Sequence, residues 1–537
     1  MNVSFENPVC GSGMRLKGKL GAAAAVLVTI FGLGLCGSGC GEYYRPVAIP
    51  VPQPGGDPQP TRHALVVSSN GAQPGSAVVI DVSGDDAVAV LSGINGLGQN
   101  PVYAIAPTGT DYVVDQGSDN VAFFTLASIG QPNLITLPAG AAPVFAASAP
   151  GKLFVAEQGR NKVAVIELST NSLSTEIPVG SNPVALVATP DGSQLYCLNQ
   201  GDNTVTVILP ANNTVFTTIN LTGTIPVWGA VSSDGTRVFV ANQGSSTVSV
   251  IDTATDTVVN TKAVGAGPKY ITYDPMLNRA YVTSPPDGSI SIIENATAAP
   301  PAVPTVTKVP LASPSPCNGT TPISITALAD GTRAYVADQA GNSVCILNTT
   351  SNTFTKRICL VQAPAVSTDP CVAGAAPAFI ASDSNSFRVY TANQFQTAAF
   401  AISSISRQNI TNPVTGVVTG LVTVTTTSSV PFQAGQPVTI SGVQFDTSFN
   451  GVFGITSITA PNRFTYVQTG LLNSASAAPG ASATAAVLPY VSLIQTANDS
   501  LVPNDNEATD NASLNLITPP LTIDAGGTPT FIVMTPF

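Results

Sequence analysis

The feature that most constrains the fold is an internal repeat with a usual spacing of 42 or 43 residues. One copy reads Arg237-Val-Phe-Val-Ala-Asn-Gln-Gly244, and another reads Gln194-Leu-Tyr-Cys-Leu-Asn-Gln-Gly201. A period of this length, built from short alternating strands, is typical of β-propellers, in which each repeat forms one four-stranded blade. We therefore predict an all-β chain that forms a propeller of eight blades, with seven as the alternative. The repeated Gln falls at equivalent positions 70, 116, 158, 200, 243, 285, 339 and 394.

Each repeat is expected to contain four strands, as residues 180–220 illustrate. Residues 183–189 are almost continuously apolar, which is typical of a strand that is covered on both faces. Pro190-Asp-Gly-Ser193 has the composition of a hairpin turn, and residues 194–198 follow it as the second strand. Residues 204–209 and 214–219 alternate between polar and apolar side chains, so we expect them to be the outer strands.

The two ends of the chain are expected to meet in one blade. Seven apolar first strands start near prolines, whereas eight second strands are present. The missing first strand lies at the C-terminus, where Gly526-Gly-Thr-Pro529 resembles Gly180-Ser-Asn-Pro183. We therefore expect residues 513–537 to complete the blade whose outer strands begin at His63, which we expect to be exposed. This pairing removes two exposed sheet edges and closes the ring.

A separate module interrupts the last blade. Residues 405–488 contain several short strands with Asn450-Gly451 and Pro461-Asn462 turns, which favour a small β barrel or sandwich. We interpret Phe400-Ala-Ile-Ser-Ser404 as the third strand of the last blade. On this interpretation the module lies between the third and fourth strands, on the face opposite the turns between second and third strands. Residues 489–512 are interpreted as a polar linker that returns to the propeller.

The N-terminal segment has the pattern of an export signal. Arg15, Lys17 and Lys19 precede an apolar run, residues 21–35, that is too short to span a bilayer comfortably. The run closes on Gly37-Ser-Gly-Cys40, which resembles a bacterial lipobox, and this resemblance implies a lipid on Cys40. Residues 41–62 contain many prolines and are predicted to be an extended tether. We expect an exported protein that is lipid-anchored in the bacterial envelope; the alternative is ordinary cleavage and release.

The strands that carry the repeat also carry a family resemblance. Phe239-Val-Ala-Asn242, followed by Thr247-Val-Ser-Val-Ile-Asp252, resembles the YVTN-type β-propeller repeat of bacterial and archaeal exported proteins. The resemblance covers residues 63–404. It implies a propeller in an exported protein, in agreement with the N-terminal signal.

The composition excludes several classes of function. Only 9% of residues are charged, the net charge is −11, and the chain has a single His. A nucleic-acid binder needs a basic surface, and most haem and multi-histidine metal centres need more than one His. We expect no nucleic-acid partner and no cofactor, with Ca²⁺ as the open alternative.

Five cysteines lie beyond the N-terminal signal, and four of them cluster around the seventh blade. In the repeat frame Cys345 lies on a third strand and Cys359 on the adjacent fourth strand. Cys317 and Cys371 precede successive first strands at comparable positions. We therefore predict the disulfides Cys345–Cys359 and Cys317–Cys371 in an oxidising compartment. Cys197 replaces an apolar residue of its repeat and is expected to be buried.

The last residue of each second strand offers the only recurrent candidate site. Asp115, Glu157 and Asp338 are acidic at this position, where other copies have Asn or Ser. One interpretation is structural, because Asx side chains at hairpin starts bond nearby backbone N–H groups. The alternative is that these three carboxylates bind a cation or a hydroxylated ligand.

These observations predict a non-catalytic binding scaffold more than an enzyme, because the chain has no recognisable catalytic motif. The ligand face is expected at the channel mouth and at two long loops, 313–321 and 362–376, because long loops on rigid frames carry binding sites. The expected partners are a membrane, through the lipid anchor, and an unidentified protein or carbohydrate of the envelope; the chain itself is expected to be monomeric. One alternative is a lactonase-like hydrolase with a divalent cation, and another is a structural surface component.

Overall fold

A computed structural model of the chain describes residues 63–534 with internal gaps. The predicted signal segment, Cys40 and the tether lie outside the described residues. So do most of the loop 362–376 and the second half of the predicted linker. The gaps are 71–72, 82–85, 92–96, 108, 126–131, 299–303, 313–314, 362–370, 372–373, 383–387, 412–417, 470–474, 478, 502–521 and 525–527.

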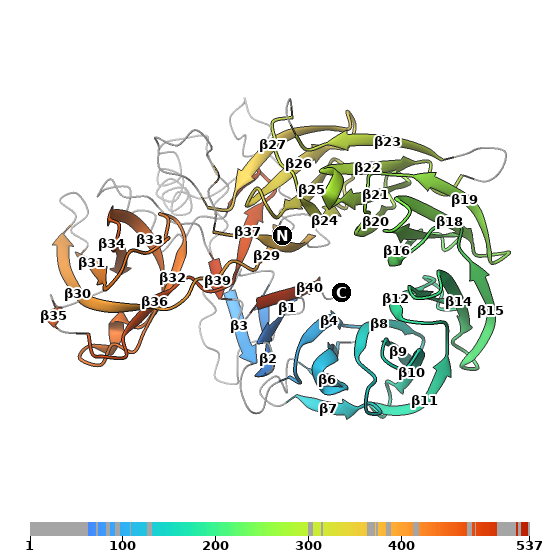
Figure 1. Cartoon of the computed structure of the whole chain (residues 1–537), viewed down its shortest axis with the longest axis horizontal. Helices are drawn as coiled ribbons and strands as arrows, with labels where there is room; N and C mark the ends of the chain where they lie inside the picture. The colour runs from blue at the N-terminus through green and yellow to red at the C-terminus, as the bar shows by residue number, and fades with distance from the viewer. Residues whose placement is uncertain are drawn as a thin grey trace, which may run out of the picture. The chain divides into compact units, whose positions relative to one another are not determined.

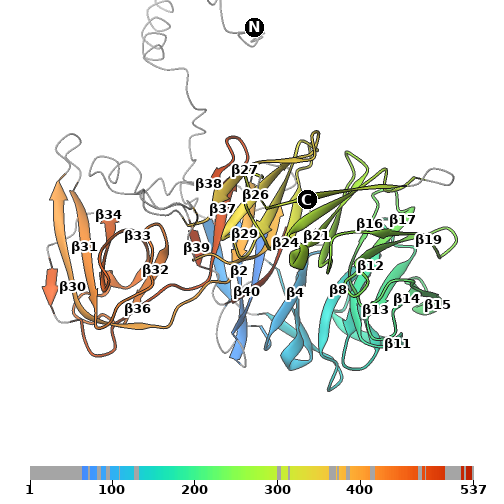
Figure 2. The same cartoon turned by 45° about the horizontal axis from the view of Figure 1, so that its top comes forward.

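Eight antiparallel sheets form a ring, which confirms the predicted propeller of eight blades (Figures 1 and 2). Blades 2 to 7 each use four consecutive strands, with the first strand innermost. Blades 1 and 8 combine strands that are distant in sequence. From the innermost strand outward, the blades are: blade 1, β40 (Thr528–Met534), β1 (His63–Asn70), β2 (Gln73–Asp81), β3 (Asp86–Leu91); blade 2, β4 (Pro101–Ile105), β5 (Asp111–Asp115), β6 (Asn120–Phe124), β7 (Asn133–Thr136); blade 3, β8 (Pro143–Ala149), β9 (Lys152–Glu157), β10 (Lys162–Glu167), β11 (Ser172–Pro178); blade 4, β12 (Pro183–Ala188), β13 (Leu195–Asn199), β14 (Thr204–Leu209), β15 (Thr214–Asn220); blade 5, β16 (Pro226–Val231), β17 (Arg237–Asn242), β18 (Thr247–Asp252), β19 (Thr257–Ala263); blade 6, β20 (Tyr270–Asp274), β21 (Arg279–Ser284), β22 (Ser289–Glu294), β23 (Thr305–Pro310); blade 7, β24 (Pro322–Ala327), β25 (Arg333–Asp338), β26 (Ser343–Asn348), β27 (Thr353–Cys359); and blade 8, β28 (Pro377–Ser382), β29 (Arg388–Asn393) and β37 (Tyr490–Gln495), the last pairing with both β38 (Ser500–Leu501) and β39 (Thr522–Asp524).

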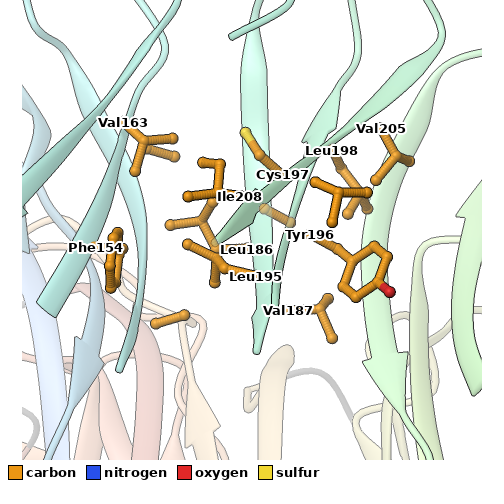
Figure 3. Packing of buried hydrophobic residues seen from close by; sticks show 14 of the residues in the cluster. Phe154, Val163, Leu186, Val187, Leu195, Tyr196, Cys197, Leu198, Val205 and Ile208 are labelled. Carbon is orange, nitrogen blue, oxygen red and sulfur yellow. The ribbon is translucent and has the colours of Figure 1, made fainter. Parts of the chain in front are cut away.

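The core lies between neighbouring blades. Both faces of each middle strand are covered, so β9, β13 and β17 bury almost every side chain, whereas the outermost strand β15 exposes most of its residues. Figure 3 shows the contact between blades 3 and 4, where Phe154 and Val163 lie near Leu186 and Leu195. Burial of such apolar surface is the main favourable term in folding. The charge deficit of the sequence follows from this double-sided burial.

The turn before each third strand explains a second repeated feature of the sequence. Asn161, Asn203 and Asn342 have φ values of 54°, 58° and 49° at this position. Asn tolerates the left-handed region better than most residues, and Gly288 takes the same place in blade 6 with φ 59°. The polar, uncharged turns therefore have a conformational cause.

The chain ends meet in blade 1, as predicted. β40 pairs antiparallel with β1, and Ile532 lies opposite Val66. The expectation of an exposed His63 was wrong: it is 5% exposed, and its Nε2 lies 2.8 Å from Asp111 Oδ2 of blade 2. The reason is that β1 is the second strand of its sheet, covered by β40 and β2, and is not an edge strand.

The inserted module is a closed β-barrel, drawn in orange in Figure 1. Its strands follow the order β31-β34-β33-β32-β36-β30, and β30 pairs back with β31 to close the barrel, while β35 adds to β30. Phe432, Phe449 and Phe464 are buried in its interior. The strands are β30 (Phe400–Thr411), β31 (Val418–Thr426), β32 (Pro437–Ser441), β33 (Gly451–Ala460), β34 (Arg463–Thr469), β35 (Ala475–Ala477) and β36 (Thr484–Ala486).

The predicted attachment of this module was wrong by one strand. Phe400–Ser404 belongs to β30 of the barrel, and the third strand of blade 8 is β37, Tyr490–Gln495, within the predicted linker. The barrel therefore lies between the second and third strands, at the same end of the blade as the turns that follow the repeated Asn. Tyr490-Val-Ser-Leu-Ile-Gln495 alternates like Thr247-Val-Ser-Val-Ile-Asp252, which is the signal that distinguishes it from a linker.

In the part of the chain that the structure describes, no helix is long and apolar enough to cross a bilayer.

Candidate functional site

The candidate carboxylates occupy equivalent positions and are fully buried. Asp115, Glu157 and Asp338 each end a second strand and lie opposite the proline that starts the first strand of the same blade. At the same position Asn199 donates from Nδ2 to the hydroxyls of Thr204 and Thr206, at 3.0 and 2.9 Å. Asn199 therefore links the end of the second strand to the third strand of its blade, through side-chain hydroxyls and not through backbone N–H groups.

Two of the three carboxylates bind the connection between blades. Asp115 accepts a hydrogen bond from the Gly98 N–H at 2.9 Å, and Asp338 accepts from Thr320 and Thr321 N–H at 3.2 and 2.9 Å. A Cβ on Gly98 would meet Asn120 and Ser118, so glycine permits the close approach of this connection. Both carboxylates thus have backbone partners in the connection that enters their blade.

The structure does not bring these three carboxylates together. They belong to blades 2, 3 and 7 of the ring. Among the described residues, the one group of three or more side chains with metal-ligand spacing is Cys317, Asp338 and Cys345, and its two cysteines form a disulfide. Asp115 and Glu157 are absent from that group. The three residues therefore cannot act as one shared site.

Burial changes the acidity of two of these carboxyl groups. Burial raises the pKa of Asp115 to about 8, although N–H donors from Gly98 and Ala122 oppose the change. Burial, followed by the neighbouring Glu176 carboxylate, raises the pKa of Glu157 to about 8. Neither oxygen of Glu157 accepts a hydrogen bond, and the nearest cation, Arg160, is 3.8 Å away. Both groups are therefore protonated over much of the range in which ordinary carboxyls are charged.

The predicted cysteines form disulfides, but in a different pairing. The structure joins Cys317 to Cys345 and Cys359 to Cys371, with Cα atoms 5.4 and 4.8 Å apart. Cys345 lies opposite Arg357, and Cys359 lies opposite Ser343, so Cys345 and Cys359 are diagonal in the sheet and not side by side. Cys317, in the loop before β24, instead bonds Cys345 on β26, the third strand of the same blade. Cys197 is free and buried, as predicted.

An aromatic layer across the centre of the ring was missed by the sequence analysis. Its members lie two residues after the proline of the first strands, in six of the eight blades. Each ring contacts the next, with centroid distances of 4.0 Å for Tyr103–Phe145, 5.2 Å for Phe145–Trp228 and 5.0 Å for Trp228–Tyr270. The circuit closes through Tyr270–Phe379, Phe379–Phe531 and Phe531–Tyr103, at 5.5, 4.4 and 4.4 Å. We call these six residues the aromatic layer: Tyr103, Phe145, Trp228, Tyr270, Phe379 and Phe531.

The layer closes the centre because contacts also run across it. Trp228 of blade 5 lies 6.5 Å from Tyr103 and 6.4 Å from Phe531, which belong to blades 2 and 1. The remaining two blades carry the small residues Ala185 and Ser324 at the same position. The centre of the ring, between the first strands, holds six bulky and two small side chains, whereas eight bulky side chains would overfill it. The signal was visible as an aromatic at a fixed offset from proline, but it appears only when the repeats are aligned on that proline.

A ring of carboxamides surrounds the starts of the first strands, at one end of the blades. The N–H of Gln116, Gln200 and Gln394 donates to the carbonyl of the residue that precedes the proline of the same blade, at 3.1, 2.9 and 3.1 Å. Their side chains bond the first strands as well: Gln200 and Gln394 donate to the Pro226 and Pro529 carbonyls of the next blades. We call the residues at these positions the rim: Asn70, Gln116, Gln158, Gln200, Gln243, Gln339 and Gln394.

Burial also changes the acidity of the two tyrosines in the aromatic layer. Burial, followed by the nearby Tyr270, raises the pKa of Tyr103 far above its ordinary value, and burial raises the pKa of Tyr270 to about 12. Both hydroxyls therefore stay neutral at physiological pH and can donate hydrogen bonds. Their rings supply flat apolar faces for contact with a ligand.

The fold and this layer define the chain as an eight-bladed β-propeller with an inserted β-barrel. No protein-family model matches the sequence, and no curated protein matches it. Similar solved structures include the hydrazine synthase of Kuenenia stuttgartiensis (18% identity, 56% of this chain and 95% of that chain, TM-score 0.43). They also include a streptogramin B lyase (13%, 62% and 96%, 0.42) and a putative 6-phosphogluconolactonase of Bacteroides fragilis (18%, 56% and 95%, 0.43). These likenesses concern the fold, and the activities in those names belong to those proteins.

Proposed function

We propose that this protein is a non-catalytic binding scaffold of the bacterial cell envelope, of the YVTN propeller type, held on a membrane by a lipid on Cys40. The observation that carries the proposal is the aromatic layer, which occupies the centre of the ring with side chains that bind rather than react. The buried carboxylates support it, because Asp115 and Asp338 bond the backbone of the connections between blades.

The hydrolase alternative needs carboxylates that converge on one substrate. Asp115, Glu157 and Asp338 lie in blades 2, 3 and 7, so they offer no common centre. Nothing in the described part of the chain favours that alternative over a binding role. The ring of stacked sheets provides a rigid frame, and the low charge density leaves mainly neutral groups on its surface. Both features suit a binding scaffold.

The lipid anchor gives the proposal a direct test. We expect the full chain, expressed in a bacterium, to be recovered in the membrane fraction, and we expect Cys40→Ser to release it into the soluble exported fraction. The physical reason is that an acylated cysteine buries hydrocarbon in the bilayer, at about 0.8 kcal/mol per CH₂. Fractionation with immunoblotting, together with labelling by a radioactive fatty acid, measures the change.

Cys36→Ser is the matched control, because it removes a neighbouring cysteine and leaves Cys40 in place. It should leave the chain in the membrane fraction. Recovery of the wild-type chain as a soluble, unlabelled protein would overturn the proposed anchor and favour ordinary cleavage and release.

A further inference from the structure

We propose that the centre of the ring, on the side of the rim, binds a neutral, hydroxyl-rich ligand: the end of a glycan chain. The inference deepens the proposed binding function and rests on it. Two sets of side chains carry it, the aromatic layer and the rim, and no rim position has a charged side chain.

The rim and the aromatic layer lie at the same end of the ring. Each glutamine of the rim follows directly after the last residue of a second strand, whereas Asn70 is itself the last residue of β1. Before each glutamine, that last residue lies opposite the proline of the first strand, as in the pair Pro183 and Asn199. The aromatic residue comes two positions after that proline. The N–H of the rim glutamine bonds the carbonyl of the residue before the proline, so the aromatic residue lies three residues inside the rim. A strand advances about 3.3 Å per residue, which places the rings roughly 10 Å inside the rim. A ligand that enters past the rim therefore passes along the starts of the first strands to reach the rings.

The rings present surface to such a ligand. Tyr103, Trp228 and Tyr270 are partly exposed, although they contact other rings of the layer. The hydroxyls of Tyr103 and Tyr270 form no hydrogen bond with any described residue, so both are available to a polar ligand. A sugar ring has a face of C–H groups and an edge of hydroxyls. The first packs on an aromatic face, and the second bonds donors and acceptors around it.

The rim divides into residues that hold the ring and residues that are free. The side chains of Gln116, Gln200 and Gln394 bond Asn100, Pro226 and Pro529. In contrast, Gln158, Gln243 and Gln339 form no side-chain hydrogen bond in the described structure, and Gln243 is exposed. A carboxamide offers both a donor and an acceptor, which matches a hydroxyl group. The free glutamines lie on alternate blades, 3, 5 and 7.

The charge of this surface selects a neutral ligand. The eight rim positions carry seven carboxamides and one proline, Pro285, with no charged side chain. The acidic residues beside the rim, Asp115, Glu157 and Asp338, are fully buried.

The charged side chains of the turns just after the rim already have partners in the structure. Arg160 pairs with Glu176, Asp287 pairs with Lys308, and Asp202 accepts hydrogen bonds from the Thr204 hydroxyl and the Ser181 N–H. Lys269, directly before β20, is exposed. Rim positions without charge favour uncharged hydroxyls over a polyanion, which needs several unpaired cations.

The test is a panel of immobilised neutral oligosaccharides, with acidic oligosaccharides and short peptides on the same array. The protein is the full chain with Cys40→Ser, purified in its oxidised form. We expect saturable binding to at least one neutral oligosaccharide, confirmed by calorimetry in solution. The triple variant Gln158→Ala, Gln243→Ala, Gln339→Ala should weaken this binding at least ten-fold. Its melting temperature should not change, because these side chains hold no part of the ring.

Two further variants separate binding from folding. Trp228→Leu should also weaken binding at least ten-fold, because central aromatic residues dominate such contacts. Phe216→Leu, on the outer strand β15 and 61% exposed, should leave binding unchanged. The glycan inference is overturned by binding to no neutral oligosaccharide, by preference for acidic sugars or peptides, or by binding that the triple variant does not weaken. Release of a shortened or modified oligosaccharide would instead overturn the non-catalytic function, since a scaffold returns its ligand unchanged.

Discussion

Deletion of residues 524–537 is expected to abolish the soluble monomer. The deletion removes β40, whose Phe531 and Ile532 are 8% and 2% exposed and whose backbone pairs with β1. Burial of two such side chains contributes roughly 1.5–3 kcal/mol each. The loss also exposes one edge of β1, where residues 64–67 are all apolar and fully buried in the intact ring. An unpaired apolar edge is a template for aggregation.

Size-exclusion chromatography with light scattering measures this outcome directly. The matched control is deletion of residues 535–537 alone, which leaves every residue of β40 in place. We expect the short deletion to give a monomer and the long deletion to give aggregates. A long-deletion protein that is monomeric, with the melting temperature of the intact chain, would show that the ring does not depend on its closing strand.

Asp115→Asn with Glu157→Gln is expected to stabilise the protein at pH 8 and to flatten its pH dependence. Both groups have pKa values of about 8 in the folded state, above those of unfolded carboxyls. The folded state therefore holds more protons between pH 4 and 8, and the free energy of unfolding falls as the pH rises through this range. Neutral amides remove this loss, so the gain in the free energy of unfolding is largest at pH 8.

Thermal unfolding at pH 5 and pH 8 checks this result. We expect the double variant to melt roughly 2–4 °C higher than the wild type at pH 8, and to gain less at pH 5. Asp338→Asn is the matched control, because both oxygens of Asp338 accept hydrogen bonds, one from the N–H groups of Thr320 and Thr321 and the other from the Ser343 hydroxyl. The NH₂ group of an amide cannot accept the second of these, whereas Oδ1 of Asp115 has no partner to lose. Asp338→Asn should lower the melting temperature at both pH values. If the double variant is destabilised equally at both pH values, the claim that Asp115 and Glu157 are buried and protonated in the folded protein is wrong.

The repeat predicts the fold almost completely, because its pattern is local. Alternating strands, turn residues and the proline before each first strand recur in every blade, so eight copies give eight sheets. Ring closure is predictable for the same reason, since residues 526–529 resemble residues 180–183. Local pattern and global architecture agree in this chain.

The errors concern features that depend on register and on distant segments. Cys345 and Cys359 lie on adjacent strands, but their diagonal register leaves Cys345 next to Cys317 of a loop. The strand of residues 400–404 alternates as a blade strand does, so only the pairing partner assigns it to the barrel. The aromatic layer is formed by residues from six blades, and no single repeat shows that they meet.

The central claim is that aromatic residues from six blades close the middle of the ring, and Trp228 reports on it directly as the only tryptophan of the chain. We predict that its fluorescence emission lies at shorter wavelength than that of free tryptophan and is only partly quenched by acrylamide. Phe145→Ala and Phe531→Ala should each shift the emission to longer wavelength, because these rings contact Trp228, whereas Phe216→Ala should not. A folded monomer whose Trp228 emits and is quenched like free tryptophan would contradict the account.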